Sequence, residues 1–187
     1  MGVSVTDASV FDPQTNTWTD LTSASLTSPL YPFMFVMPDG RVLNAGGSGE
    51  VTTITRALNV STETWTTIDS NLTDGGSAAM YLPGKVIKSG TPYDDRPTGT
   101  PASRVTWILD MTQPAPAWRQ SGAMAFPRAH HNLTILPDGS VLATGGSVTT
   151  NGKAGANPVY AASSMSFDLD PRSFLPSVAT WTQSTAP

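Results

Sequence analysis

Short apolar segments that end at turn signals make up most of the chain. The segments 30–37 and 41–45 are largely apolar and too short for helices, so each predicts a buried strand, the first with both faces covered. The Pro-Asp-Gly sequence at 38–40 separates them and predicts a tight turn. No segment sustains a period of 3.6 residues, so the pattern indicates an all-β protein.

This turn-and-strand unit occurs three times. The segments 37–47 and 136–146 each place Pro-Asp-Gly before an apolar strand and a double glycine, and 82–90 is a weaker copy. The three turns follow one another at intervals of roughly 45 to 55 residues, which is typical of β-propeller blades. The repeat therefore predicts the fold more firmly than it predicts any chemistry.

An outer hairpin also recurs, each time with a tryptophan. The segments 8–11 and 17–21 flank a turn that begins at Asp-Pro, and they predict the first such hairpin. The recurring tryptophans are Trp18, Trp65, Trp118 and Trp181. Because they return with the repeat, we expect them to pack between sheets rather than to bind sugars.

Four short strands per repeat predict a β-propeller of about three four-stranded blades plus part of a fourth. The expected blade units are 1–21, 30–68, 76–121 and 127–184. Such a set forms an incomplete ring, because propellers need about four or more blades. We therefore expect a fragment of a longer propeller, and a β-sandwich with fortuitous internal similarity is the alternative fold.

Composition excludes several classes of protein. Only 13 % of the 187 residues are charged, and the net charge of −4 leaves no basic stripe for nucleic acid. The absence of cysteine excludes disulfides and thiolate chemistry within the chain. The apolar runs are too short to span a membrane, and the N-terminus does not look like a signal peptide.

The two histidines, His130 and His131, are candidates for a pocket at the propeller axis. Neighbours on a strand point to opposite faces, so the pair cannot chelate one metal ion. One of them could line the axial pocket, or one could pack inside a blade while the other faces solvent. Arg128 could likewise point into the axial channel, lie at the surface or link two blades.

Several of these elements together resemble the kelch-type propeller of galactose oxidase and glyoxal oxidase, the copper radical oxidases. They are Phe-Asp-Pro-Gln-Thr-Asn-Thr-Trp at 11–18, the Pro-Asp-Gly turns, the double glycines and Pro-Arg-Ala-His-His-Asn at 127–132. The resemblance covers nearly the whole chain. It implies an extracellular protein that oxidises an alcohol or aldehyde with O₂ and releases hydrogen peroxide.

The resemblance also implies a copper ion bound by two tyrosines and two histidines, with one tyrosine cross-linked to a cysteine. On this chain the radical tyrosine would precede residue 1, and the second tyrosine with its adjacent histidine would follow Pro187. The cysteine has no counterpart. We therefore expect no catalytic, cofactor-binding or metal-binding residue in this chain, which alone is predicted to be inactive, with copper bound by the longer parent protein.

What the chain could still offer is a lining for the substrate. The resemblance places His130 where the family has an aromatic residue on the substrate side. The other candidates for lining the substrate are His131, Arg128 and Tyr31. The arginine that galactose oxidase offers to its sugar falls near Pro32, which argues against galactose as the substrate.

The expected partners are a small alcohol, aldehyde or carbohydrate and the remaining propeller blades of the parent. The alternative function is a kelch-repeat binding module for a protein or glycan, without catalysis. Its contacts would come from the loops 48–53, 91–103 and 147–160.

Overall fold

The computed structural model describes residues 6–29, 31–47, 54–73, 75–91 and 100–149, together with two further strands at 163–166 and 180–183. The expected loops 48–53, most of 91–103 and most of 147–160, as well as the side chain of Trp181, lie outside this description. Every regular element in the described part is a strand, and it contains no helix.

The strands form one two-stranded and three four-stranded antiparallel sheets. The first sheet is β1 (Ala8–Asp12) and β2 (Thr17–Leu21), and the second is β3 (Pro32–Val36), β4 (Val42–Gly47), β5 (Thr55–Asn59) and β6 (Thr64–Asp69). The third is β7 (Ser77–Leu82), β8 (Lys85–Ser89), β9 (Thr106–Asp110) and β10 (Arg119–Gln120). The fourth is β11 (Asn132–Ile135), β12 (Val141–Thr144), β13 (Ser163–Ser166) and β14 (Thr180–Gln183).

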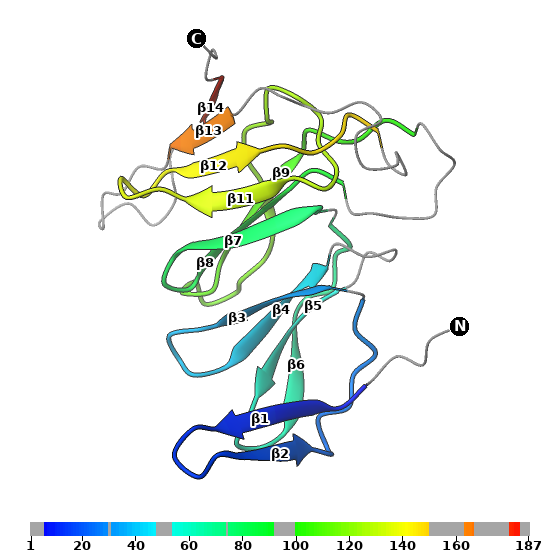
Figure 1. The fold of residues 1–187 in the computed structure, drawn as a ribbon, viewed down its shortest axis with the longest axis vertical. Helices are drawn as coiled ribbons and strands as arrows, with labels where there is room; N and C mark the ends of the chain where they lie inside the picture. Colours follow the sequence, from blue (N-terminus) through cyan, green and yellow to red (C-terminus); the bar gives the residue numbers. More distant parts are fainter. Residues whose placement is uncertain are drawn as a thin grey trace.

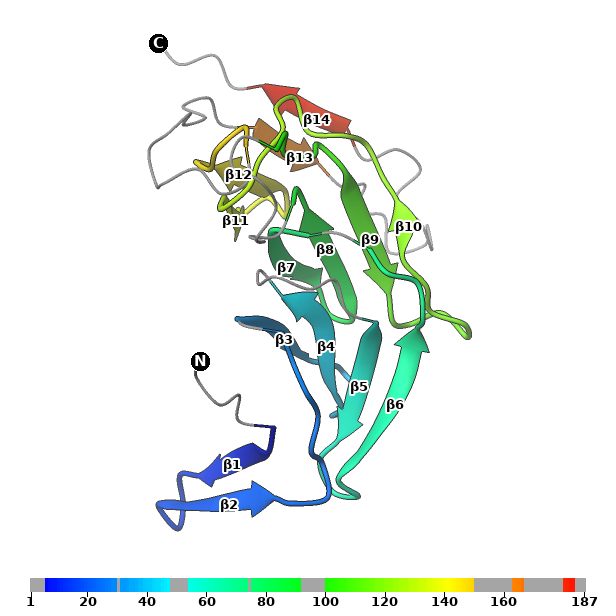
Figure 2. The same ribbon diagram turned by 90° about the vertical axis from the view of Figure 1, so that its right-hand side faces the viewer.

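The four sheets follow one another along an arc (Figures 1 and 2). Within each four-stranded sheet every strand pairs with the next one in sequence. Figure 2 shows β3, β7 and β11 along the inner side of the arc, with β6 and β10 along its outer side. This is the architecture of propeller blades, and the described strands do not close a ring. The predicted all-β, propeller-type fold is therefore confirmed.

Pro-Asp-Gly turns connect β3 with β4 and β11 with β12, and both turns have the predicted geometry. In the second sheet the Gly40 amide donates to the Met37 carbonyl at 2.9 Å, and the Gly139 amide donates to the Leu136 carbonyl at 2.9 Å in the fourth. Gly40 has φ 84° and Gly139 has φ 81°, values that favour glycine. The Pro-Asp-Gly sequence thus specifies where each inner strand reverses.

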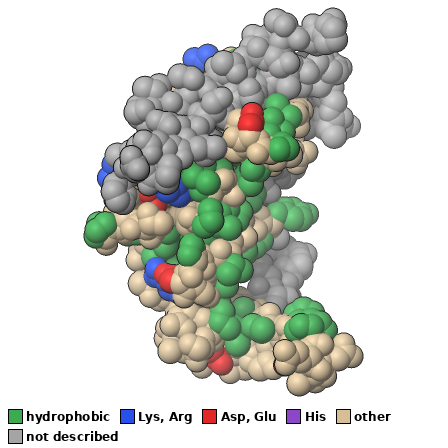
Figure 3. All heavy atoms as spheres, turned by 90° about the vertical axis from the view of Figure 1, so that its left-hand side faces the viewer, with side chains coloured by type: hydrophobic (Ala, Val, Ile, Leu, Met, Phe, Trp, Pro, Cys, Tyr) green, Lys and Arg blue, Asp and Glu red, His purple; other side chains and the backbone are tan. Residues whose placement is uncertain are grey.

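Few charged side chains interrupt the molecular face shown in Figure 3. Lys, Arg, Asp and Glu are scattered over it, and hydrophobic side chains cover much of the described area. The ion pair of Arg41 with Asp39, at 2.7 Å, is a local contact within one turn. No part of this face, within the described residues, presents a patch of one charge.

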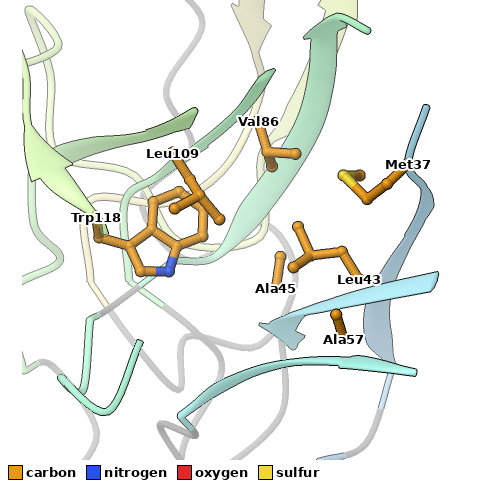
Figure 4. Close-up of a cluster of buried hydrophobic side chains, with 7 residues drawn as sticks. All are labelled: Met37, Leu43, Ala45, Ala57, Val86, Leu109 and Trp118. Atoms are coloured by element: carbon orange, nitrogen blue, oxygen red, sulfur yellow. The ribbon is translucent and has the colours of Figure 1, made fainter. Parts of the chain in front are cut away.

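The core lies between the sheets, because each strand turns alternate side chains toward its two neighbouring sheets. Figure 4 shows the cluster between the second and third sheets. Its buried members are Met37, Leu43, Ala45 and Ala57 from the second sheet and Val86, Leu109 and Trp118 from the third. Burial of each large side chain contributes about 1.5–3 kcal/mol.

Two smaller clusters join the other pairs of sheets. Leu21 and Ala24 of the first sheet's end pack with Leu58 of the second. Val141 of the fourth sheet packs with Tyr81 and other residues of the third. Each sheet is therefore held by the one that precedes it in the chain.

Two expectations about burial are wrong. The segment that forms β3 was expected to be buried on both faces, yet Met34 is 41 % exposed and Val36 is 65 % exposed. Trp18, expected to pack, is 69 % exposed, whereas Trp118 is buried. The reason is the same in both places: no further sheet of the described residues covers these surfaces of the first and second sheets.

Candidate functional site

The segment that carries Arg128 and both histidines is held between the third and fourth sheets. The Thr91 amide, just after β8, donates to the Arg128 carbonyl at 3.0 Å. Ala129 pairs with Thr91 on one side and with Ser147 on the other. The segment therefore passes between two neighbours before it becomes β11, which begins only at Asn132.

His131 is buried and makes one side-chain hydrogen bond. Its Nε2 atom lies 2.8 Å from the Ser89 hydroxyl oxygen, while Nδ1 has no hydrogen-bond partner among the described residues. Burial, aided by the positive charge of Arg128, lowers the pKa of His131 to about 3. The imidazole is therefore neutral at physiological pH. Because Ser89 is fully buried, this Ser–His pair is inaccessible to a substrate.

Arg128 is fully buried beside this histidine. Its Nη1 atom donates to the carbonyl of Gly145, which follows β12. Burial lowers the pKa of the guanidinium. The side chain thus ties the segment before β11 to the end of β12, within the unit that forms the fourth sheet.

The other two candidate lining residues, His130 and Tyr31, are exposed. Both have left-handed backbone, with φ 56° at His130 and φ 54° at Tyr31. For a residue with a Cβ atom this conformation is uncommon and costs energy. The sequence had suggested that His130 lies in an extended strand, and this expectation is wrong. The chain kinks at His130, between the pairing at Ala129 and the start of β11.

The structure thus brings together Arg128 and His131 and leaves His130 at the surface of the same segment. Tyr31 precedes β3 of the second sheet, so it comes from a different blade. Whether these four residues line a substrate site stays a prediction.

A second polar cluster, which the sequence reasoning missed, joins the second and third sheets. Lys88 is buried, its ammonium group donates to the Ala45 carbonyl at 3.1 Å, and it lies 4.2 Å from the centre of the Trp118 ring. The Trp118 indole nitrogen donates to the Thr55 hydroxyl at 2.6 Å, and its amide donates to Asp69 at 2.8 Å. The available signal was a lysine at the strand position that holds Asn44 and Ala143 in the other repeats.

A small pocket lies on the third sheet between β9, β10 and the connection that joins them. Its polar lining includes Tyr81, Asp110 and Arg119. Burial raises the pKa of Tyr81. Burial alone would also raise the pKa of Asp110, but hydrogen bonds from Thr112 and other neighbours lower it. Asp110 also pairs with Lys85 at 3.2 Å, so its charge is already compensated within the sheet.

The described residues do not fit a copper site. They contain no group of three or more His, Cys, Asp or Glu side chains that could hold a metal ion. The whole sequence lacks cysteine, and of its two histidines one is buried against Ser89. The described residues also contain no helix that is long and apolar enough to cross a bilayer.

Comparison with solved structures finds a similar fold in a copper oxidase. A novel fungal alcohol oxidase of the AA5 family, determined in complex with copper, matches 99 % of this chain with a TM-score of 0.71 and 19 % sequence identity. The match spans 39 % of the length of that chain. No protein-family model matches the sequence. No curated protein matches it either. The structural match shows the fold of this chain.

Proposed function

We propose that this chain is a segment of the kelch-type β-propeller of a longer, secreted copper oxidase resembling galactose oxidase and glyoxal oxidase. The observation that carries the proposal is the structural match, which covers almost all of this chain but only 39 % of the fungal alcohol oxidase. The parent would oxidise an alcohol to an aldehyde, or an aldehyde that has added water to form its hydrate to an acid. Two electrons and two protons pass to O₂, which leaves as hydrogen peroxide.

The role of this chain in that parent is structural, and the chain by itself is inactive. Its described residues offer no group of His, Cys, Asp or Glu that could hold a metal ion. We assign the copper ion and its ligands to other parts of the parent. What the chain contributes is an arc of sheets. We assign its blade units to 1–21, 30–68, 76–121 and 127–184.

Within the chain, His130 and Tyr31 are the candidates for contact with a substrate, because their side chains are exposed. Arg128 and His131 are buried, and we assign them the task of holding the segment that presents His130. An imidazole and a phenol can both donate hydrogen bonds to a hydroxyl or carbonyl oxygen. Such contacts suit a small alcohol, aldehyde or carbohydrate.

The experiment is expression of the parent from its extended coding sequence, followed by copper loading and measurement of peroxide release with primary alcohols and aldehydes. We expect release that depends on copper, and none from residues 1–187 alone. A copper-loaded, folded parent that releases no peroxide with any of these substrates would contradict the proposal. Binding of that parent to a glycan array or a protein would then favour the kelch binding module.

A further inference from the structure

The strand β1 has one paired edge and one open edge. Among the strands that the structure describes, β1 pairs with β2 alone, through Ala8–Asp12 and Thr17–Leu21. In each four-stranded sheet the strand at the corresponding place, namely β5, β9 or β13, pairs on both sides. The open edge of β1 therefore presents backbone groups that the other sheets satisfy within themselves.

The first sheet corresponds to the outer half of the second. Phe11 pairs with Trp18 in the first, as Leu58 pairs with Trp65 in the second. The turns also match: in both, the side chain of the last residue of the first strand accepts a hydrogen bond from the amide two residues later, at 2.8 and 3.1 Å. Just before the second strand, Asn16 has φ 55° and Glu63 has φ 52°.

This correspondence gives the register of the open edge. In the second sheet β4 pairs with β5 through Val42 with Leu58, Leu43 with Ala57 and Asn44 with Arg56. The residues of β1 that correspond to Arg56, Ala57 and Leu58 are Ser9, Val10 and Phe11. A strand equivalent to β4 would therefore pair with β1 across residues 9–11.

An exposed apolar surface of the second sheet faces the same place. Met34 is 41 % and Val36 is 65 % exposed, and Val36 pairs with Val42, which packs against the interface between the first and second sheets. The matching pair in the third sheet is Met80 with Val86, and both pack in the cluster with the second sheet. The lower part of Figure 3, level with β1 and β2 in Figure 1, shows hydrophobic side chains at the surface.

We propose that this surface, made of the β1 edge at 9–11 with Met34 and Val36, binds a β-hairpin from the part of the parent outside residues 1–187. One strand of the hairpin, equivalent to β4, pairs antiparallel with β1. The other strand, equivalent to β3, lies on the far side of the first, toward the inside of the arc. The inference rests on the proposed function, because the occupant is the missing inner half of a blade.

The second sheet indicates the chemistry of that hairpin. Its inner strands turn Phe33, Phe35, Leu43 and Ala45 toward the third sheet. The hairpin is expected to carry apolar residues at alternate positions in the same way, directed at Met34 and Val36. It would thereby remove both exposed side chains from water and pair the open edge.

The test supplies a surrogate hairpin from the chain itself. In the full chain, residues 1–5 are replaced by a second copy of residues 31–52, which contains β3 and β4 and joins Thr6 in the register of the second sheet. We expect the midpoint of thermal unfolding to rise by about 5 °C or more. Hydrogen exchange should slow at least about tenfold at those amides of residues 9–11 that point to the open edge, because they gain hydrogen bonds to the added strand.

Two controls make the result specific. Prolines in place of the copied Val42 and Asn44 remove pairing and should abolish both effects. Val36→Asp should reduce the gain in midpoint, whereas Leu72→Asp, at a side chain 63 % exposed elsewhere, should leave it intact. Equal protection of residues 9–11 with and without the prolines would overturn the proposal.

If the extended chain does not fold, a cross-linking measurement on the original chain decides. The sequence has no cysteine, so Val10→Cys provides a single thiol on β1. A synthetic peptide of residues 31–52 carrying Leu43→Cys should form a disulfide with it at least about ten times faster than with Thr19→Cys on β2. Equal rates would overturn the proposal. Docking without peroxide release by the parent would reject the oxidase alone, and peroxide release without docking would reject this surface alone.

Discussion

Trp118 joins the second and third sheets through contacts of three kinds. Its ring packs in the apolar cluster of Figure 4, its indole nitrogen donates to Thr55, and Lys88 lies over its face. Trp18 occupies the corresponding outer hairpin of the first sheet but is mostly exposed. Tryptophans at the same position of the repeat thus contribute differently to the free energy of unfolding, because a neighbouring sheet covers Trp118 but not Trp18.

The first prediction compares these two tryptophans. Trp118→Phe should lower the free energy of unfolding by about 1–3 kcal/mol, because the buried Thr55 hydroxyl loses its donor. Trp18→Phe should change it by no more than about 0.5 kcal/mol. Urea unfolding followed by circular dichroism measures both. Equal losses at the two sites would show that the Thr55 bond does not stabilise the sheets.

His131 makes stability depend on pH. Its pKa of about 3 in the folded chain lies below the ordinary value of 6.5, so the unfolded chain binds more protons between these two values. Stability should therefore be fully present above about pH 6.5 and fall as the pH drops toward 3, by at most about 1.4 kcal/mol per pH unit from this group. Urea midpoints measured across that range test the slope.

The control for this pH dependence is His131→Gln, which can keep a hydrogen bond to Ser89 but cannot be protonated in this range. It should flatten the slope, whereas His130→Gln at the exposed neighbour should leave it steep. A slope that persists in the His131 variant would assign the dependence to carboxylates, and this prediction would be wrong.

At the scale of elements, the fourth sheet approaches the third so closely that only glycine fits at one strand end. Gly90 follows β8 with φ 73°, and a Cβ atom placed there would lie 2.3 Å from the Arg128 carbonyl oxygen and 2.7 Å from the His131 ring. Gly40 has a similar φ of 84°, but a Cβ atom there meets nothing within 4 Å. An alanine at Gly40 would therefore meet backbone strain alone, whereas an alanine at Gly90 would meet the same strain and a steric clash.

The third prediction compares Gly90→Ala with Gly40→Ala in the second sheet, which serves as its control. Gly40→Ala should cost about 1–2 kcal/mol, the expense of left-handed backbone in an alanine. Gly90→Ala should cost more than about 3 kcal/mol, because the clash with Arg128 adds to the same strain. Denaturant unfolding measures both, and a similar loss at the two glycines would mean that the third and fourth sheets separate without cost.

At the scale of the whole molecule, the outer face of the first sheet is open. Phe11 and Trp18 lie 5.2 Å apart between ring centres, and both are exposed. The corresponding Trp65 packs against the first sheet, and its indole nitrogen donates to the Ala24 carbonyl at 2.8 Å. An aromatic surface that a preceding blade covers elsewhere is thus bare here, which favours association through it.

The last prediction is that isolated residues 1–187 associate as concentration rises and are only marginally stable. Sedimentation velocity from micromolar to near-millimolar protein should show a growing fraction of oligomer. The double variant Phe11→Ser with Trp18→Ser should reduce that fraction, and Leu72→Ser should not. A monomer at all concentrations with a sharp two-state melt would contradict the prediction.

The sequence by itself determined the local conformations and their order. Pro-Asp-Gly turns, the outer hairpins and the repeat spacing depend on neighbouring residues, so the strands and the propeller-type fold could be predicted from them. Burial could not be predicted as well, because the exposure of Trp18 and Val36 depends on whether another sheet is present.

Only the tertiary structure decided the candidate site. It buried Arg128 and His131 and exposed His130, since pairing of Ala129 with two neighbours kinks the chain before β11. It also placed Lys88 against Trp118, a contact between residues of different repeat elements that no local pattern specifies. Local sequence sets backbone shape, whereas contacts between sheets determine which side chains reach solvent and which charges must be satisfied inside.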